Sequence, residues 1–152
     1  MTSVFRLCRE KHPPFDGQGS FLRGNRWTSK GLRAVYTSAH RSLAQLEYLV
    51  HVDLSEIPDD LIMAEARIPD DVSRQRVSAN KLPSNWQTYP APLSLRVIGD
   101  KWVKRSEHCI LIVPSAVQPE EENWILNVAH PEFSRIDCSA KPSKFVYDNR
   151  LL

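Results

Sequence analysis

Hydrophobic and polar positions predict strands in several parts of the chain. Residues 61–68 alternate with the period of two that is typical of a strand with two different faces. Residues 109–113 form instead a continuous apolar run that stops at Pro114, which is typical of a strand buried on both faces. Shorter segments with strand character are residues 4–7, 34–37, 124–127 and 144–147.

A helix is predicted over residues 39–52, where Leu43, Leu46 and Val50 recur at the spacing of one helical face. Ser38 stands where an N-cap residue is expected. At about 100° per residue, Glu47 lies about 40° from Leu43 on the helical wheel. A carboxylate therefore borders the stripe that is expected to face the core.

A second helix is predicted over residues 94–105 from the spacing of Leu95, Ile98 and Trp102. The stretches 12–19 and 83–92 are rich in turn-forming residues, so both are expected as loops, and the first is long enough to be functional. Strand-like and helix-like segments follow one another without a repeat or a linker. This order predicts a single compact α+β (mixed α/β) domain over residues 1–152, with a mixed β-sheet core flanked by helices.

Composition argues against several classes of function. The chain has 152 residues, and its 20 Lys and Arg against 18 Asp and Glu leave a net charge of +2. The basic residues are dispersed along the chain and do not indicate a nucleic-acid-binding surface. No apolar run reaches the roughly 18 to 20 residues of a membrane span, and no secretory leader is recognised, so a cytoplasmic protein is expected. Three widely spaced cysteines and five unpaired histidines give no support for a disulfide or a metal site.

Glu47 is the first candidate for chemistry, because burying a carboxylate is costly unless an Arg or hydrogen-bond donors compensate it. The alternative is a boundary glutamate that reaches water or pairs with His51 one turn later. Arg26 is the second candidate, since it follows a turn at Gly24 and Asn25 and could present a guanidinium to a phosphate. The alternative there is an ordinary entry from a loop into a strand.

Tyr36 and Ser115 are the other two candidates. Tyr36 lies near the end of a predicted strand and is either a core tyrosine or a platform for a ligand. Ser115 directly follows a buried strand, a place where α/β proteins often carry functional groups. The chain has no Gly-x-Ser-x-Gly elbow, Walker loop or Gly-x-Gly-x-x-Gly turn, so a serine hydrolase, an ATPase and a Rossmann dehydrogenase are not supported.

Taken in order, ten blocks of the chain carry a resemblance to a known family. They are residues 5–6, 17–20, 24–28, 34–38, 42–47, 83–86, 99–102, 113–117, 123–131 and 145–151. Together they resemble the RES-domain family, the toxin half of bacterial Xre–RES toxin–antitoxin pairs. Two positions depart from the family pattern, since Asn25 replaces a usual glycine and Thr28 replaces a usual asparagine.

The resemblance implies a fold similar to that of ADP-ribosyltransferase toxins and an enzyme that consumes NAD as its substrate, without a metal. Members degrade NAD as glycohydrolases or phosphorylases to arrest growth. The alternatives are ADP-ribosyl transfer to a macromolecule, or a catalytically silent module that only binds an antitoxin. The implied partner is an Xre-type antitoxin protein, with no direct contact to nucleic acid or membrane and with a homodimer as one form of the toxin in the complex.

The resemblance also implies roles for individual residues. Glu47 would stabilise the positive charge that develops on the ribose as nicotinamide leaves, and Arg26 and Tyr36 would complete the catalytic group. Tyr36 would stack on the nicotinamide ring, and the arginines would bind the pyrophosphate. The residues expected to hold the dinucleotide are Arg6, Arg26, Tyr36, Ser115 and Asn127.

Overall fold

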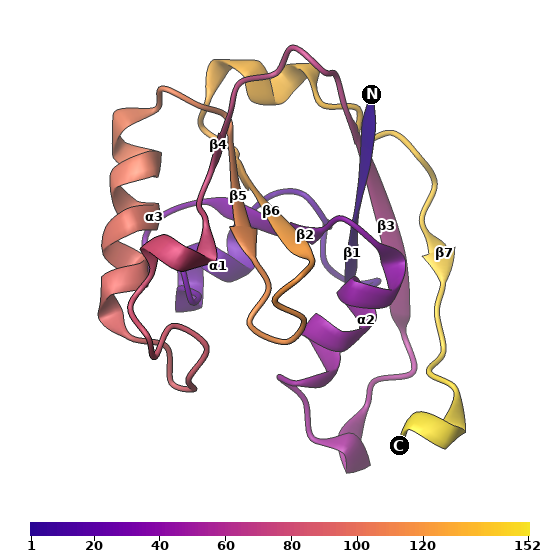
Figure 1. Ribbon diagram of the computed structural model, residues 1–152. Coiled ribbons are helices and arrows are strands. Elements are labelled where there is room, and N and C mark those ends of the chain that lie inside the picture. Colours follow the sequence, from indigo (N-terminus) through magenta and orange to yellow (C-terminus); the bar gives the residue numbers. More distant parts are fainter.

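Seven strands form one mixed sheet in the computed structural model, which describes residues 1–152 (Figure 1). The strands are β1 (Thr2–Arg9), β2 (Ala34–Ser38), β3 (Leu61–Ile68), β4 (Arg74–Arg76), β5 (Ile110–Pro114), β6 (Glu122–Asn127) and β7 (Ser143–Lys144). Their order across the sheet is β4-β5-β6-β2-β1-β3-β7. All neighbours are antiparallel except β4 and β5, which run parallel. The predicted α+β fold with a mixed sheet is thereby confirmed.

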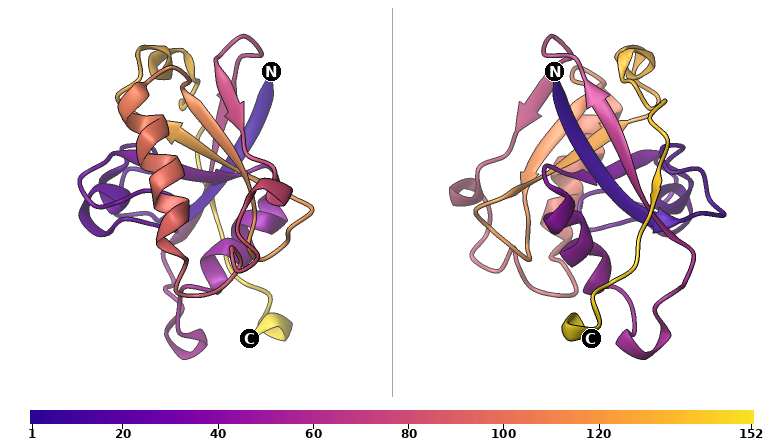
Figure 2. Two further views of the ribbon diagram at one scale, coloured as in Figure 1. Left: turned by 60° about the vertical axis from the view of Figure 1, so that its left-hand side comes forward. Right: turned by 90° about the vertical axis from the view of Figure 1, so that its right-hand side faces the viewer.

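Three α-helices flank the sheet, together with four short 3₁₀ turns (Figures 1 and 2). The helices are α1 (Gln18–Arg23), α2 (Arg41–Leu49) and α3 (Leu93–Arg105), and the 3₁₀ turns are η1 (Leu54–Glu56), η2 (Ala79–Lys81), η3 (Pro131–Arg135) and η4 (Asn149–Leu151). In both figures α3 stands on the side of β4 and β5, and the C-terminal segment with β7 runs along the outer edge of β3. No helix is long and apolar enough to cross a membrane.

The core divides into three clusters because side chains alternate between the two faces of each strand. Val35, Ile112 and Leu126 belong to a cluster on one face, which the segment around Phe133 and Ile136 helps to cover. The other face carries two clusters. In one, side chains of β5 and β6 pack against α3, and in the other, side chains of β1 and β3 pack against α2. The C-terminal ends of β2 and β5 adjoin the N-terminal end of β6.

The hydrophobic pattern located most strands correctly, and β3 spans residues 61–68 as predicted. Neither the six-residue α1, which begins at residue 18 near the end of the expected loop 12–19, nor the three-residue edge strand β4 was predicted. The strand predicted over residues 144–147 is reduced to β7, in which only Lys144 falls within the predicted range. The helix predicted over residues 39–52 is also shorter, since α2 ends at Leu49 and has His40, not Ser38, as its N-cap residue.

Candidate functional site

The Glu47 carboxylate is held from one side only. Its Oε1 accepts a hydrogen bond of 2.6 Å from the Ser115 hydroxyl and one of 2.8 Å from the Asn123 side-chain amide. Its Oε2 has no hydrogen-bond partner in the protein, and Glu47 forms no ion pair. Half of the carboxylate is therefore fixed in place, and the other half is available to a ligand.

Three strand ends bring these donors together. Ser115 is the first residue after β5, Asn123 is the second residue of β6, and their strands pair so that Val113 lies opposite Asn123. Ser38, the last residue of β2, pairs with Asn123 from the other side and donates its hydroxyl to the Asn123 side-chain carbonyl at 2.7 Å. The Ser38 hydroxyl thus stabilises the site and does not cap α2.

The buried face of α2 differs from the predicted stripe. Leu43 and Ala44 are buried, whereas Leu46 and Val50 are 41% and 57% exposed. Glu47 follows Leu43 by one turn, so it does border the buried face as the wheel predicts, but Leu46 and Val50 do not belong to that face. The alternative ion pair between Glu47 and His51 is not formed.

Arg26 lies close enough to Glu47 for an electrostatic interaction. Burial lowers the pKa of Arg26, and the negative charge of Glu47 partly opposes this effect. The guanidinium uses Nη1 to donate to the carbonyls of Trp86 at 2.8 Å and Thr88 at 3.1 Å, whereas Nε and Nη2 have no acceptor. Arg26 is therefore also held on one side and free on the other, and the two charges do not pair with each other.

The loop of residues 86–89 links the parts of the site. Besides the two carbonyls that bind Arg26, this loop contains Gln87, whose amide donates to the Ala116 carbonyl at 3.3 Å beside Ser115. Tyr89, which is 82% exposed, lies with its ring centroid 6.4 Å from that of His51 at the end of α2. The loop before α3 thus contacts the Arg26 segment, the turn after β5 and α2.

Tyr36 is anchored by its hydroxyl group. The hydroxyl forms a 2.9 Å hydrogen bond with the Thr28 hydroxyl and accepts a 3.2 Å hydrogen bond from the backbone N–H of Trp27. Burial strongly raises the pKa of Tyr36, so the phenol stays neutral. Thr28, at the position of a usual asparagine, therefore has a structural partner, and the ring of Tyr36 packs beside the α3 cluster.

Helix α3 supports the segment that carries Arg26. A Cβ atom at Gly99 would lie 1.7 Å from the Trp27 carbonyl oxygen, so only glycine allows the helix to approach this closely. The next residue, Asp100, accepts hydrogen bonds from the Ser29 backbone N–H at 2.8 Å and hydroxyl at 2.6 Å. Gly99 and Asp100 thus place the Arg26 segment against the helix.

Two other residues expected to bind the dinucleotide, Asn127 and Arg6, have different surroundings. Asn127 is buried at the far end of β6 from Asn123, and its Oδ1 accepts a hydrogen bond from the Ala129 N–H in the following turn. Arg6 lies in β1, where its Nη1 donates to the Tyr36 carbonyl at 3.2 Å and its buried Nε has no partner. Neither side chain is hydrogen-bonded to Glu47, Ser115 or Asn123, although Arg6 contacts the backbone of Tyr36, so the expected role of both in binding the dinucleotide stays a prediction.

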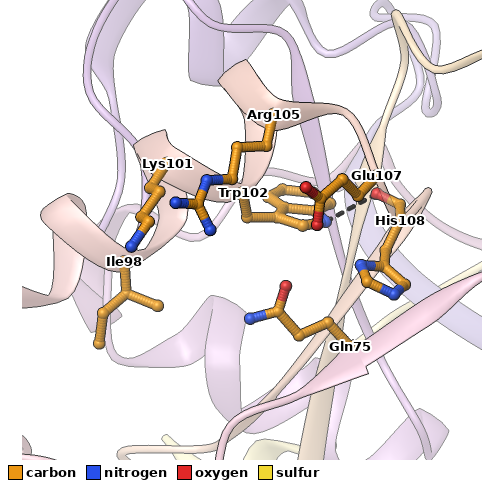
Figure 3. A pocket seen from close by; sticks show the side chains of 7 residues that line it. All are labelled: Gln75, Ile98, Lys101, Trp102, Arg105, Glu107 and His108. Carbon is orange, nitrogen blue, oxygen red and sulfur yellow. Dashed lines mark hydrogen bonds between the residues drawn. The ribbon is translucent and has the colours of Figure 1, made fainter.

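A separate cavity of about 200 Å³ lies between the end of α3 and β4 (Figure 3). Lys101 and Arg105 of α3 and Gln75 of β4 line it, beside Trp102, whose indole N–H donates to the His108 carbonyl at 2.8 Å. None of the candidate residues borders this cavity. The chemistry of Glu47 therefore belongs to a different part of the surface.

Sequence reasoning missed Asn123 and Ser38 as members of the site. Asn123 stands four residues before Asn127 in the same Asn-x-x-x-Asn segment, and only the pairing of β2, β5 and β6 shows which of the two reaches Glu47. A polar residue at the end of each of three strands is the signal that could have found them.

The chain is similar to a known family and to named toxins. A family model described as the RES domain matches residues 3–148. The "Prs ADP-ribosylating toxin" of a Sphingobium species is 33% identical over 157 residues, covering 99% of this chain and 97% of the relative. A protein named "Toxin Res" from Photorhabdus laumondii is 36% identical over 152 residues, covering 98% of this chain and 96% of the relative.

The fold is also similar to that of a solved structure. A chain in the crystal structure of the Mycobacterium tuberculosis MbcT–MbcA toxin–antitoxin complex superposes with a TM-score of 0.78, covering 95% of this chain and 84% of that chain. The sequence identity is 11%, so this likeness concerns the fold alone.

Proposed function

This chain belongs to the RES-domain family, and from that premise we propose that it is the toxin of a toxin–antitoxin pair and cleaves the bond between nicotinamide and ribose in NAD. One observation carries this proposal. The Glu47 carboxylate is fixed through Oε1 and free at Oε2, and the loop of residues 86–89 links its donor Ser115 to an Arg26 guanidinium that is free at Nε and Nη2. A carboxylate and a guanidinium that both keep free hydrogen-bonding atoms suit a ligand that carries both a pyridinium and a pyrophosphate.

The chemistry of the bond explains why a carboxylate suffices. When the bond from ribose C1′ to the pyridinium nitrogen breaks, its electron pair stays on that nitrogen and nicotinamide leaves as a neutral molecule. The leaving group needs no proton, and the remaining difficulty is the positive charge on the ribose, as in glycoside cleavage. Water or phosphate then attacks C1′, and water loses a proton to solvent in doing so.

Each residue of the site has a role that follows from its free atoms. Glu47 Oε2 would accept a hydrogen bond from a ribose hydroxyl and offset the developing charge. The free Nε and Nη2 of Arg26 would bind a pyrophosphate oxygen through charge-assisted hydrogen bonds. The ring of Tyr36 would contact the nicotinamide, since its hydroxyl is already bonded to Thr28. Ser115 would act through Glu47, because its hydroxyl proton is donated there.

The test is the release of nicotinamide from NAD by the purified protein, compared with a Glu47→Gln variant. Glutamine keeps the shape and removes the charge, so the rate should fall by about 10²-fold or more. Glu56→Gln, at an exposed position in η1, is the matched control and should turn over NAD as the wild type does. Equal rates for Glu47→Gln and the wild type would refute the assignment. Reactions with and without inorganic phosphate distinguish phosphorolysis from hydrolysis by the mass of the product.

A second candidate is ADP-ribosyl transfer to a macromolecule at the same site. The relative named "Prs ADP-ribosylating toxin" favours it, since the similarity to this chain extends over nearly both lengths. Labelled NAD incubated with a cell extract would then label a protein or nucleic acid, whereas free ADP-ribose as the only product would contradict it.

The antitoxin partner belongs to the same proposal. The structural neighbour was solved as a toxin–antitoxin complex, which supports an antitoxin for this chain as well, and the family resemblance suggests the Xre type. Co-expression with the protein encoded by the adjacent reading frame should relieve growth arrest. Binding of that protein without NAD turnover or growth arrest would indicate a catalytically silent antitoxin-binding module instead.

A further inference from the structure

On the premise of the NAD-cleaving function proposed above, we infer that Ser38 and Asn123 are positioning residues that fix the orientation of the Glu47 carboxylate, so that one oxygen is bonded to the protein and the other faces the substrate. Asn123 contacts Glu47 through its amide nitrogen at 2.8 Å, and Ser38 contacts Asn123 through the amide oxygen at 2.7 Å. The serine therefore acts on the carboxylate through the asparagine. Neither residue is expected to touch the reacting atoms.

The orientation of the Asn123 amide is determined by its two neighbours. Its nitrogen is a donor only and its oxygen an acceptor only, so the nitrogen has to face the carboxylate and the oxygen has to face the serine hydroxyl. A flipped amide would place its oxygen against Glu47 Oε1, where two acceptors repel each other. The Ser38 hydroxyl, which is buried, stabilises the productive orientation by donating to the oxygen.

The consequence for Glu47 is that Oε1 has no remaining capacity. A carboxylate oxygen has two lone pairs, and the hydroxyl of Ser115 and the amide of Asn123 use both. A substrate hydroxyl can then bind only at Oε2. Because both donors are uncharged, they hold the carboxylate without neutralising it, which leaves its charge to act on the ribose cation.

Ser38, Asn123 and Ser115, which hold the Glu47 carboxylate directly or through one another, are themselves anchored. Ser38 and Asn123 belong to paired strands, and Ser115 is fixed because its Oγ also accepts the N–H groups of Val117 and Gln118, both at 3.1 Å. Catalytic groups depend on such support, since a displacement of about 1 Å can reduce the rate by about 10²-fold.

The test combines Asn123→Asp, Asn123→Ala and Ser38→Ala, with nicotinamide release from NAD as the readout. Asn123→Asp keeps the shape but replaces the amide by a second carboxyl group, and two carboxyl groups at this distance share one proton at lower pH and both ionise only at higher pH. We expect kcat to fall by about 10²-fold at pH 6 and to recover partly at pH 9, with KM changed less than twofold. The other ionisable groups that act on Arg26 are Tyr36 and Tyr89, and both are unaltered in these variants.

Ser38→Ala tests the order of action. Alone it should lower kcat by about 10-fold, because the amide is then free to flip. In the Asn123→Ala background the same change should cost nothing further, since Ser38 then has no amide to orient. Independent, multiplicative losses in kcat, or a fall in Asn123→Asp activity that is the same at every pH, would overturn the inference.

Asn149→Asp is the matched control, because it adds the same charge at an exposed position in η4. It should leave kcat and its pH dependence at the wild-type values. If wild-type protein releases nicotinamide and the Asn123 and Ser38 variants behave like this control, the inference fails while the proposed function stands. If wild-type protein releases no nicotinamide, the proposed function fails. The inference is then decided by the side-chain amide signals of Asn123 in a nitrogen-15 NMR spectrum. These signals should shift in Ser38→Ala, and unchanged signals would overturn the inference.

Discussion

Gly99→Ala should lower both the activity and the stability of the protein, because it forces α3 away from the segment that carries Arg26. The added Cβ would lie 1.7 Å from the Trp27 carbonyl oxygen and 2.7 Å from its carbonyl carbon, both backbone atoms that cannot rotate away. Restoring a separation of at least 3.0 Å at the oxygen requires α3 and the Arg26 segment to move apart by about 1.3 Å. This movement would also lengthen the two hydrogen bonds from Ser29, in the same segment, to Asp100, one residue after Gly99.

The expected magnitudes differ for the two properties. Overpacking of this kind costs about 1 to 3 kcal/mol of stability, and alanine returns up to about 1 kcal/mol through its higher helix propensity. The net loss in the free energy of unfolding should be up to about 2 kcal/mol. Nicotinamide release should fall by about 10²-fold, because Arg26 adjoins the displaced Trp27 and a shift of about 1 Å has that effect on positioned groups.

Urea denaturation followed by tryptophan fluorescence gives the stability, and nicotinamide release gives the activity. Gly19→Ala in α1 is the matched control, since a Cβ there meets only the end of the Arg23 side chain at 3.5 Å. This control should be as active as the wild type and up to about 1 kcal/mol more stable. A Gly99→Ala protein with wild-type stability and wild-type turnover would refute the close approach of α3 to Trp27.

Three further predictions concern parts of the chain outside the site. Burial raises the pKa of Cys109 to about 12, so on the order of 10⁻⁴ of this thiol is ionised at pH 8. Iodoacetamide should therefore modify the half-buried Cys138 before Cys109. The reverse order of modification, observed by mass spectrometry, would contradict this prediction. The Arg9 guanidinium holds the pKa of Asp60 below its unfolded value of about 3.9, so the stabilisation is present above that pH and is lost as the pH falls through the lower folded pKa. Asp60→Asn should therefore lose less stability than the wild type between about pH 5 and pH 2. Equal losses in the two proteins would be evidence against the ion pair. Tyr147→Phe removes a hydrogen bond to a carbonyl of α2 and should lower the free energy of unfolding in urea by about 1 kcal/mol, whereas an unchanged midpoint would argue against that bond.

Hydrophobic periodicity predicted those elements whose burial is regular. Strand β3 and the apolar run of β5 are buried along most of their length, so their patterns survive in the sequence. Strand β4 has the sequence Arg-Gln-Arg and forms because its backbone pairs with β5, which no local pattern indicates. The face of α2 was wrong for a related reason, since Ala44 contributes little hydrophobicity to the pattern and is nevertheless buried.

The site was predicted only as far as single residues allow. Glu47 and Ser115 were each recognisable from their positions next to an apolar stripe and a buried strand, and the structure joins them by a hydrogen bond. Asn123 requires the register of β2 against β6, because a shift by one residue would turn its side chain to the other face of the sheet. Register depends on long-range pairing, and a single sequence does not specify it.

The charges of the site are arranged so that neither neutralises the other. Arg26 and Glu47 interact electrostatically, yet each is hydrogen-bonded to uncharged groups: Arg26 to two backbone carbonyls, Glu47 to a hydroxyl and an amide. A direct ion pair would satisfy both charges and leave nothing for a ligand. Because uncharged neighbours hold each of them, each keeps free hydrogen-bonding positions, and a ligand that carries an anion and a cation at matching positions would satisfy both at once. The cation in NAD disappears when nicotinamide leaves and reappears on the ribose, so a carboxylate fixed beside this bond would be complementary to the charge before and during cleavage.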